Sequence, residues 1–308
     1  MKIYIRSIAS ISPQPAAAIA PLPTTPPTGN RLKAIEPDYT TFIDAKSIRR
    51  MSRIVKMGVA AAYRCLREAG VEKPDAIVTG TAYGCLEDTG IFLSQLIGQQ
   101  EEMLSPTPFI QSTHNTVGAQ IALMLQCTGY NNTFVHRGFS FESALLDGML
   151  LLQESAARTV LVGGLDEITE ASHSILERFG LYNHGAVAGE GAAFFLLTAE
   201  PSGKDYAVLE GLATFYKPAT TDDMDANIRR FLSGHSLTRE DIDLVLTGAD
   251  FKQLCGEYPT ASAFALALAA GMVSTSGTAN AGNAGPKRVL IHNNYLNIHH
   301  SLMLVSKC

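Results

Sequence analysis

The stretches VLVGGLDE, residues 160–167, and GAVAGEGAAFFLL, residues 185–197, decide the fold of this chain. Each contains an apolar run that is typical of a buried strand. The first run is interrupted by the double glycine Gly163-Gly164, and the second is preceded by Gly-Glu-Gly at residues 189–191. The Gly-Glu-Gly triplet alone is only moderately specific. In this order, after the double glycine, it becomes a strong signal for the fold.

Strands and helices alternate along the rest of the chain. Apolar runs predict strands at residues 1–13, 75–84, 132–138, 158–166, 191–199, 206–217, 242–250, 288–294 and 300–307. Helical spacing predicts helices at residues 48–70, 116–126, 141–156, 222–234 and 260–272. Residues 13–30 are rich in proline and small residues, which predicts an extended surface segment. The alternation predicts an α/β fold with a mainly parallel or mixed sheet covered by helices.

Composition and charge narrow the class of protein. With 46% hydrophobic and 17% charged residues, the chain resembles a soluble globular protein, and its net charge of −5 gives no global reason to expect nucleic-acid binding. The five cysteines are scattered without a CxxC pair, which favours a reducing cytoplasm over a disulfide framework or a zinc site. No run reaches the roughly 20 apolar residues of a membrane span. We therefore predict a cytoplasmic protein without a bound metal or cofactor.

In their order along the chain, these elements resemble the β-ketoacyl synthases of the thiolase fold. VLVGGLDE is similar to the family's Ala-Gly-Gly-Val-Asp strand, GAVAGEGAAFFLL to its Gly-Phe-Val-x-Gly-Glu-Gly-Ala strand pair, and residues 105–123 to the segment before its active-site strand. The resemblance implies two similar halves with mixed five-stranded sheets in an αβαβα layering. We expect a first half over residues 1–200 and a shortened second half over residues 201–308, forming one compact unit.

The resemblance also implies a nucleophile site and a pair of catalytic histidines. Ketosynthases carry a cysteine at the head of a helix, where the helix dipole lowers the thiol pKa and backbone N–H groups can hold an oxyanion. When residues 131–148 are aligned with that strand-to-helix turn, Gly138 takes the place of the cysteine. The first catalytic histidine of the family aligns with Gly248. Without a side chain at either position, neither an acyl-enzyme nor the first histidine's hydrogen bond is available.

The remaining family motifs are altered in the same way. In the motif Lys-x-x-x-Gly-His the chain keeps Lys252 but has Glu257 in place of the histidine, and a carboxylate would repel a developing enolate. The family's glycine-rich loop, which closes the oxyanion hole, aligns with residues 291–301, where the glycines are missing and Tyr295 replaces a phenylalanine. The resemblance therefore implies a ketosynthase scaffold whose condensation chemistry has been removed.

One family surface is retained in sequence. Ketosynthases dock the acidic acyl carrier protein through a basic cluster, and AKSIRRMSR, residues 45–53, matches its position. Lys46, Arg49 and Arg50 are the counterparts, and Arg53 and Lys56 are expected to extend the patch. The alternative is an ordinary basic helix start that is solvated at the surface.

Ser140 has two interpretations from sequence. It lies in GFSFE, residues 138–142, which is one residue away from the G-x-S-x-G nucleophile elbow. Glu142 replaces the final glycine of that motif, and a negative charge there would disfavour an alkoxide. The simpler interpretation is that the Ser140 hydroxyl caps the following helix.

The other ionisable residues favour structural roles. His136, His292, His299 and His300 could suggest a general base or a metal site. His299 and His300 are adjacent, so in a strand they point to opposite faces and cannot line one pocket. Lys252 and Glu257, if buried together, are expected to form an ion pair of mainly structural value.

Three hypotheses for function follow from the sequence. The first is an inactive ketosynthase-like subunit, similar to a chain-length factor, that pairs with an active ketosynthase or with itself and serves fatty-acid, polyketide or aryl-polyene synthesis. The second is an enzyme, an acyltransferase, decarboxylase or hydrolase, that reuses the pocket through Ser140 or through Lys252 and Glu257. The third is a scaffold without a ligand, in which the pocket would be filled.

Overall fold

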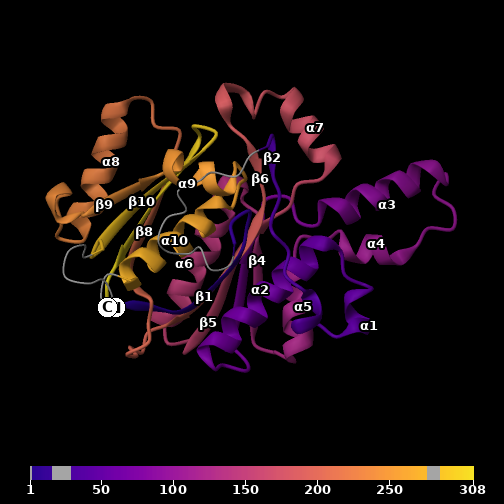
Figure 1. Ribbon diagram of the computed structural model, residues 1–308, viewed down its shortest axis with the longest axis horizontal. Helices are drawn as coiled ribbons and strands as arrows, with labels where there is room; N and C mark the ends of the chain where they lie inside the picture. Colours follow the sequence, from indigo (N-terminus) through magenta and orange to yellow (C-terminus); the bar gives the residue numbers. More distant parts are fainter. Residues whose placement is uncertain (1, 16–28, 276–284) are drawn as a thin grey trace.

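The computed structural model describes residues 2–15, 29–275 and 285–308 of the chain (Figure 1). The strands are β1 (Ile3–Ile11), β2 (Arg31–Leu32), β3 (Ala76–Gly80), β4 (Tyr130–Phe134), β5 (Thr159–Asp166), β6 (Ala188–Gly189), β7 (Gly191–Thr198), β8 (Ala207–Tyr216), β9 (Leu244–Thr247), β10 (Arg288–Tyr295) and β11 (His299–Ser306). The α-helices are α1 (Ala45–Ile48), α2 (Arg53–Ala69), α3 (Leu86–Gly98), α4 (Pro106–Gln111), α5 (Thr116–Leu125), α6 (Ser140–Gln153), α7 (Glu170–Arg178), α8 (Thr221–Gly234), α9 (Gly248–Cys255) and α10 (Ala261–Thr275).

Within the described residues, a mixed sheet of nine strands forms the centre of the molecule, in the order β4-β3-β5-β7-β1-β8-β11-β10-β9. The pairs β3–β4, β3–β5 and β9–β10 are parallel, and the other pairs are antiparallel. The predicted α/β fold class is confirmed. The two expected five-stranded sheets are instead joined into one, because β1 pairs with both β7 and β8. In the described residues the second half contributes four strands to this sheet.

Helices cover the sheet in layers (Figure 1). The middle layer consists of α6 and α10, whose apolar side chains form one core with strands from both halves. Helices α2 and α5 cover the opposite face of the first half, and α8 covers that of the second half. Strands buried on both faces explain why their sequences are nearly continuous apolar runs.

The double glycine of β5 allows close packing on both faces of the sheet. A β-carbon on Gly163 would overlap the ring of Phe194, and one on Gly164 would lie 2.7 Å from Phe141 Cδ2 and 2.8 Å from Ala263 Cβ. Such distances are far below van der Waals contact. The aromatic rings of β7 and α6 therefore occupy the space that side chains on β5 would need.

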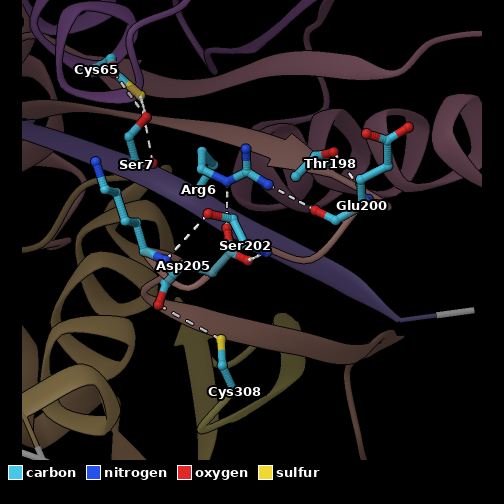
Figure 2. Close-up of polar contacts among 9 residues, drawn as sticks. Arg6, Ser7, Cys65, Thr198, Glu200, Ser202, Asp205 and Cys308 are labelled. Atoms are coloured by element: carbon cyan, nitrogen blue, oxygen red, sulfur yellow. Dashed lines mark hydrogen bonds and ion pairs between the residues drawn. The ribbon is translucent and has the colours of Figure 1, made fainter.

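Polar contacts tie the N-terminal strand to the segment between the two halves (Figure 2). The Arg6 side chain forms an ion pair with the buried Asp205 carboxylate and donates to the carbonyl of Glu200 at 2.7 Å. One residue along β1, the Ser7 hydroxyl donates to the carbonyl of Cys65 in α2 at 2.8 Å. The segment joining β7 to β8 is thus anchored to β1, the strand that belongs to both halves of the sheet.

Some local predictions differ from the structure. Helices α3, α4, α7 and α9 were not expected, and the strand predicted over residues 242–250 ends at Thr247, where α9 takes over. Most of the predicted surface segment at residues 13–30 lies outside the described residues, but Pro13 and Gln14 are buried, and Gln14 donates to the carbonyl of Leu254. No helix in the described part of the chain is long and apolar enough to cross a membrane.

Candidate functional site

The turn between β4 and α6 holds Gly138 at its centre, and this is the residue that the sequence resemblance aligns with a nucleophile. Residues Arg137–Phe139 form a short 3₁₀ turn that leads into α6. Gly138 is buried, and a β-carbon on it would lie 2.7 Å from Tyr295 Cδ1 and 2.9 Å from His299 Cβ. The space in front of this turn is therefore filled by side chains from β10 and β11.

Tyr295 is held in place by its neighbours and by the turn that follows it. The side chain is 4% exposed, and its hydroxyl lies 3.3 Å from the hydroxyl of Tyr83. Burial raises the pKa of the Tyr295 phenol, so the hydroxyl stays protonated. In the turn, the Asn297 N–H donates to Asn294 Oδ1 at 2.8 Å, and Leu296 and Asn297 have φ values of 59° and 54°. A hydrogen-bonded turn thus closes the β10–β11 hairpin directly after Tyr295.

Ser140 does not act as the predicted helix cap. Its hydroxyl donates to the carbonyl of Arg137 at 2.8 Å and accepts from the N–H of His136 at 2.9 Å, so both contacts go to the turn before the helix. The N-cap position itself is taken by Phe139, which makes no side-chain cap. Ser140 is fully buried, and its two hydrogen bonds stabilise the turn that contains Gly138.

Lys252 and Glu257 form the ion pair expected from the sequence. The Lys252 ammonium donates to both oxygens of Glu257, at 2.9 and 2.8 Å, and also to the carbonyl of Asn294. Gly248 lies one helical turn away in α9, and a β-carbon on it would be 3.4 Å from Lys252 Cε. Burial raises the pKa of the Glu257 carboxyl, and the neighbouring ammonium opposes that shift. The lysine therefore neutralises the Glu257 carboxylate.

A narrow pocket opens beside this pair. Its walls include four tyrosines, Tyr83, Tyr182, Tyr258 and Tyr295, together with Glu257. The free space is about 20 Å³, roughly the room that one water molecule needs. Within the described residues, no group of three His, Cys, Asp or Glu side chains could hold a metal ion. An acyl chain would not fit in this pocket as it stands.

Histidines of the β10–β11 hairpin point to opposite faces, as predicted. The His299 ring packs edge-on against Phe139, at 4.7 Å between ring centroids, next to the Gly138 turn. On the other face, His292 Nε2 lies 3.2 Å from His300 Nδ1, and both rings stack on Phe215. The two faces therefore separate His299 from the pair.

The predicted docking residues lie around the short helix α1. Lys46, Arg49 and Arg50 are exposed. Arg53 does not extend this patch, because its two terminal nitrogens donate to Glu190 at 2.7 and 2.6 Å. Glu190 is fully buried and is the acidic residue of the Gly-Glu-Gly triplet.

Asp166 is a structural residue of the site that the sequence reasoning missed. One carboxylate oxygen accepts from the Thr81 hydroxyl at 2.9 Å and the Ala82 N–H at 2.8 Å, and the other accepts from the Thr260 hydroxyl at 2.9 Å. Asp166 thereby joins the loop after β3 to the start of α10. Its place as a carboxylate at the end of a buried apolar strand could have indicated this role from the sequence.

Comparison with known proteins assigns the family. The sequence model of the beta-ketoacyl synthase N-terminal domain matches residues 26–202, more than half of the 308 residues. The chain belongs to the beta-ketoacyl synthase family. A search of the curated proteins finds no match.

Solved structures of beta-ketoacyl synthase type share the fold at low sequence identity. The ishigamide ketosynthase/chain length factor superposes with a TM-score of 0.80 at 15% identity, covering 100% of this chain and 99% of that one. A beta-ketoacyl synthase from Burkholderia phymatum gives 0.79 at 13% identity, covering 100% and 99%. The ketosynthase (ApeO) in complex with its chain length factor (ApeC) from Xenorhabdus doucetiae gives 0.73 at 13% identity, covering 100% and 98%. These matches confirm the thiolase-like ketosynthase fold over the whole chain.

Proposed function

We propose that this chain is a non-catalytic ketosynthase-like subunit, comparable in role to a chain-length factor. The observation that carries the proposal is the filled space at Gly138, where the ring of Tyr295 and the β-carbon of His299 lie too close to admit a nucleophilic side chain. At the two positions that align with the catalytic histidines, Gly248 has no side chain to form a hydrogen bond, and Glu257 is paired with Lys252. Condensation needs a thiolate and an oxyanion hole, and these residues supply neither.

The proposed partner is an active β-ketoacyl-carrier-protein synthase in a cytoplasmic pathway that builds fatty-acid, polyketide or aryl-polyene chains. Two of the similar solved structures are of a ketosynthase with a chain length factor. The free edge of β4 supports pairing, because β3 is the only hydrogen-bonded neighbour of β4 among the described residues. An unpaired strand edge next to apolar side chains calls for a covering chain.

The acyl carrier protein is the second proposed partner. A further similar structure, AntDE:AntF, is of a type II PKS acyl-carrier protein in complex with its ketosynthase. In this chain, Lys46, Arg49 and Arg50 present exposed cations on one short segment. Cations of this kind suit an acidic carrier protein by charge complementarity.

Co-expression with ketosynthases from the same genome tests the proposal. We expect one of them to co-purify in a 1:1 complex that elongates an acyl-carrier thioester with malonyl units. Replacing the partner's nucleophile should abolish this activity, whereas Glu257→Gln in this chain should leave it unchanged. Elongation by this chain alone, or no complex with any ketosynthase, would refute the proposal.

A ligand-free scaffold is a second candidate, because the pocket beside Tyr295 has room for about one water molecule. The two candidates differ in their effect on product length. A chain-length subunit should shift the product distribution when apolar residues at its partner interface are enlarged, whereas a scaffold should change only the yield. The enzymatic alternative through Ser140 has less support, since the hydroxyl is buried and engaged on both sides. Labelling of Ser140 by a fluorophosphonate probe would support the enzymatic alternative.

A further inference from the structure

The β10–β11 hairpin is attached to α6 next to the side chains that fill the candidate site. Strands β10 and β11 pair Tyr295 with His299 in front of the turn between β4 and α6. Two residues away on each strand, Asn293 pairs with Ser301, and this second pair lies on the same face of the hairpin. Both of its side chains donate to Glu142 Oε1, Ser301 Oγ at 2.6 Å and Asn293 Nδ2 at 3.4 Å. Glu142 of α6 therefore binds the pair that neighbours the filled site.

The Glu142 carboxyl group is buried without a cation. It is fully buried, and the ion pairs formed by the described residues do not include it. In the described part of the chain its second oxygen, Oε2, has no hydrogen-bond partner, and neither do two other buried oxygens of the same group of side chains, Asn293 Oδ1 and Ser262 Oγ. Burial raises the pKa of the Glu142 carboxyl, because a charge in this apolar layer would be poorly solvated. A proton on Oε2 would supply the donor that these acceptors lack.

The elements that contact Glu142 bring no positive charge to it. Residues 261–273 of α10 contain no titratable side chain. On the hairpin face that meets Glu142, the titratable groups are Tyr295 and His299. Burial raises the pKa of the Tyr295 phenol and lowers the pKa of the His299 imidazole, so both are neutral near pH 7. Strand β5, which packs against α6, ends at Asp166, which is an acid itself.

Lys252 and Arg137 are cations near the hairpin and the helix start, and neither balances Glu142. Lys252 donates to the carbonyl of Asn294 in β10, but its ammonium is paired with Glu257 at 2.8 Å. Arg137 precedes α6, and its side chain is exposed. The neutral acid is therefore the form of Glu142 that the folded chain favours.

We propose that Glu142 is a positioning residue that carries a proton in the folded chain and latches the β10–β11 hairpin over the Gly138 turn until the carboxyl ionises. As a neutral acid, Glu142 accepts from Ser301 through one oxygen and can donate through the other, so it joins α6 to the hairpin without a buried charge. Ionisation removes that donor and leaves a charge among unpaired acceptors, which favours separation of the hairpin from α6. Because Tyr295 and His299 lie on the same two strands, a rise in pH would loosen the filling of the site.

The pH dependence of unfolding tests the proton. As the pH rises above 4.5, the unfolded chain releases the Glu142 proton before the folded chain does, so the folded state loses stability up to the raised pKa. Over that range, each pH unit should raise the unfolding constant of the wild-type chain about tenfold relative to that of Glu142→Gln, because glutamine keeps the shape and titrates no proton. Glu142→Met, a second neutral variant of similar length, should give the same flatter response. Urea denaturation at a series of pH values measures all three chains.

Hydrogen exchange tests the latch. In the turn of the hairpin, the Ile298 N–H donates to the carbonyl of Tyr295 at 3.2 Å, and the Asn297 N–H donates to Asn294 Oδ1 at 2.8 Å. Between about pH 6 and 9, the protection factors of these amides should fall about tenfold or more in the wild-type chain and should stay constant in Glu142→Gln. The amides of α2, which does not contact the hairpin or Glu142, serve as the reference.

Glu190→Gln is the matched control, because Glu190 is also fully buried but is paired with Arg53. This variant should lose stability at about pH 7, whereas Glu142→Gln should not. The inference would be overturned by a loss in Glu142→Gln as large as that in Glu190→Gln, by an equal pH dependence in wild type and Glu142→Gln, or by unchanged protection of the hairpin. A loss of wild-type stability when NaCl is replaced by choline chloride would also overturn it, because a bound cation would then balance an ionised Glu142. Failure to find a ketosynthase partner would count against the proposed function and would not alter these measurements.

Discussion

A β-carbon at residue 138 would come within 2.9 Å of both Tyr295 and His299. A substitution at this position therefore tests whether the space in front of the turn is filled by side chains or is open. Gly138→Cys should lower the free energy of unfolding by about 1–3 kcal/mol, the usual cost of overpacking, and should give no condensing activity. Urea denaturation measures the loss. Gly90→Cys serves as the control, because a β-carbon there meets open space. An unchanged urea midpoint for Gly138→Cys would show that the side chains around the turn can move aside.

The charge of Arg53 should matter for the stability of the folded protein, whereas the charge of the exposed Arg50 should not. Glu190 is fully buried and also accepts from the N–H groups of Ala34 at 2.9 Å and Ile168 at 3.0 Å. Arg53→Met leaves that carboxylate without its cation and should cost about 3–5 kcal/mol. Arg50→Met, at an exposed site, should change stability by less than about 0.5 kcal/mol. If the double variant Arg53→Met/Glu190→Met is no more stable than Arg53→Met, then the unpaired Glu190 carboxylate is not the cause of the stability that Arg53→Met loses.

At the scale of elements, the β10–β11 hairpin contains a pair of histidines that resists protonation. Burial lowers the pKa of His292 to about 4 from 6.5 and also lowers the pKa of His300. As the pH falls below 6.5, the unfolded chain takes up a proton before the folded chain does. The folded state therefore loses stability between about pH 6.5 and 4, by at most about 3 kcal/mol for His292.

His292→Gln tests this expectation, since glutamine carries no proton to titrate. The variant should show a flatter dependence of melting temperature on pH between 6.5 and 4 than the wild-type chain. His114→Gln, at an exposed histidine outside the hairpin, should leave the wild-type dependence in place. A wild-type slope in His292→Gln would assign the acid sensitivity to other groups.

Elements were predictable from sequence where burial alone determined the pattern. Strands β5, β7 and β11 and helices α6 and α10 are apolar because the middle layer and the sheet bury them, so periodicity found them. The α3–α4 hairpin was missed because its apolar side chains point outward and cover no core of this chain. The cap assigned to Ser140 was wrong because the helix begins directly at Ser140 and the 3₁₀ turn before it takes the hydroxyl.

The candidate site was predictable only in part and for a different reason. Alignment with the family placed four residues in motifs of one active site, and the structure brings them to one region. They are Gly138, Lys252, Glu257 and Tyr295. No rule of local sequence predicts that Tyr295 fills the space at Gly138, because the two residues are 157 positions apart and meet only through the sheet. The buried role of Arg53 was hidden for the same reason, since its partner Glu190 is distant in sequence.

At the scale of the whole molecule, the question is whether residues 1–200 and 201–308 are separable. Helix α10 belongs to the second segment, yet it packs against β1, β5 and β7 of the first as well as β8, β10 and β11 of its own. Strand β1 pairs with β8, and Arg6 holds Asp205. We expect one cooperative unfolding transition by calorimetry, with equal calorimetric and van't Hoff enthalpies.

Cutting the chain provides the sharper measurement. A protease site inserted after the exposed Gly203 should allow cleavage without dissociation, because the shared core and the β1–β8 pairing remain. The same two pieces expressed apart should lack cooperative unfolding, since either piece alone would expose one side of the middle layer to water. Circular dichroism during heating reports on each piece. If the first piece melts cooperatively on its own, then the middle layer is not the joint core that its contacts indicate, and the two segments are independent domains that share a sheet.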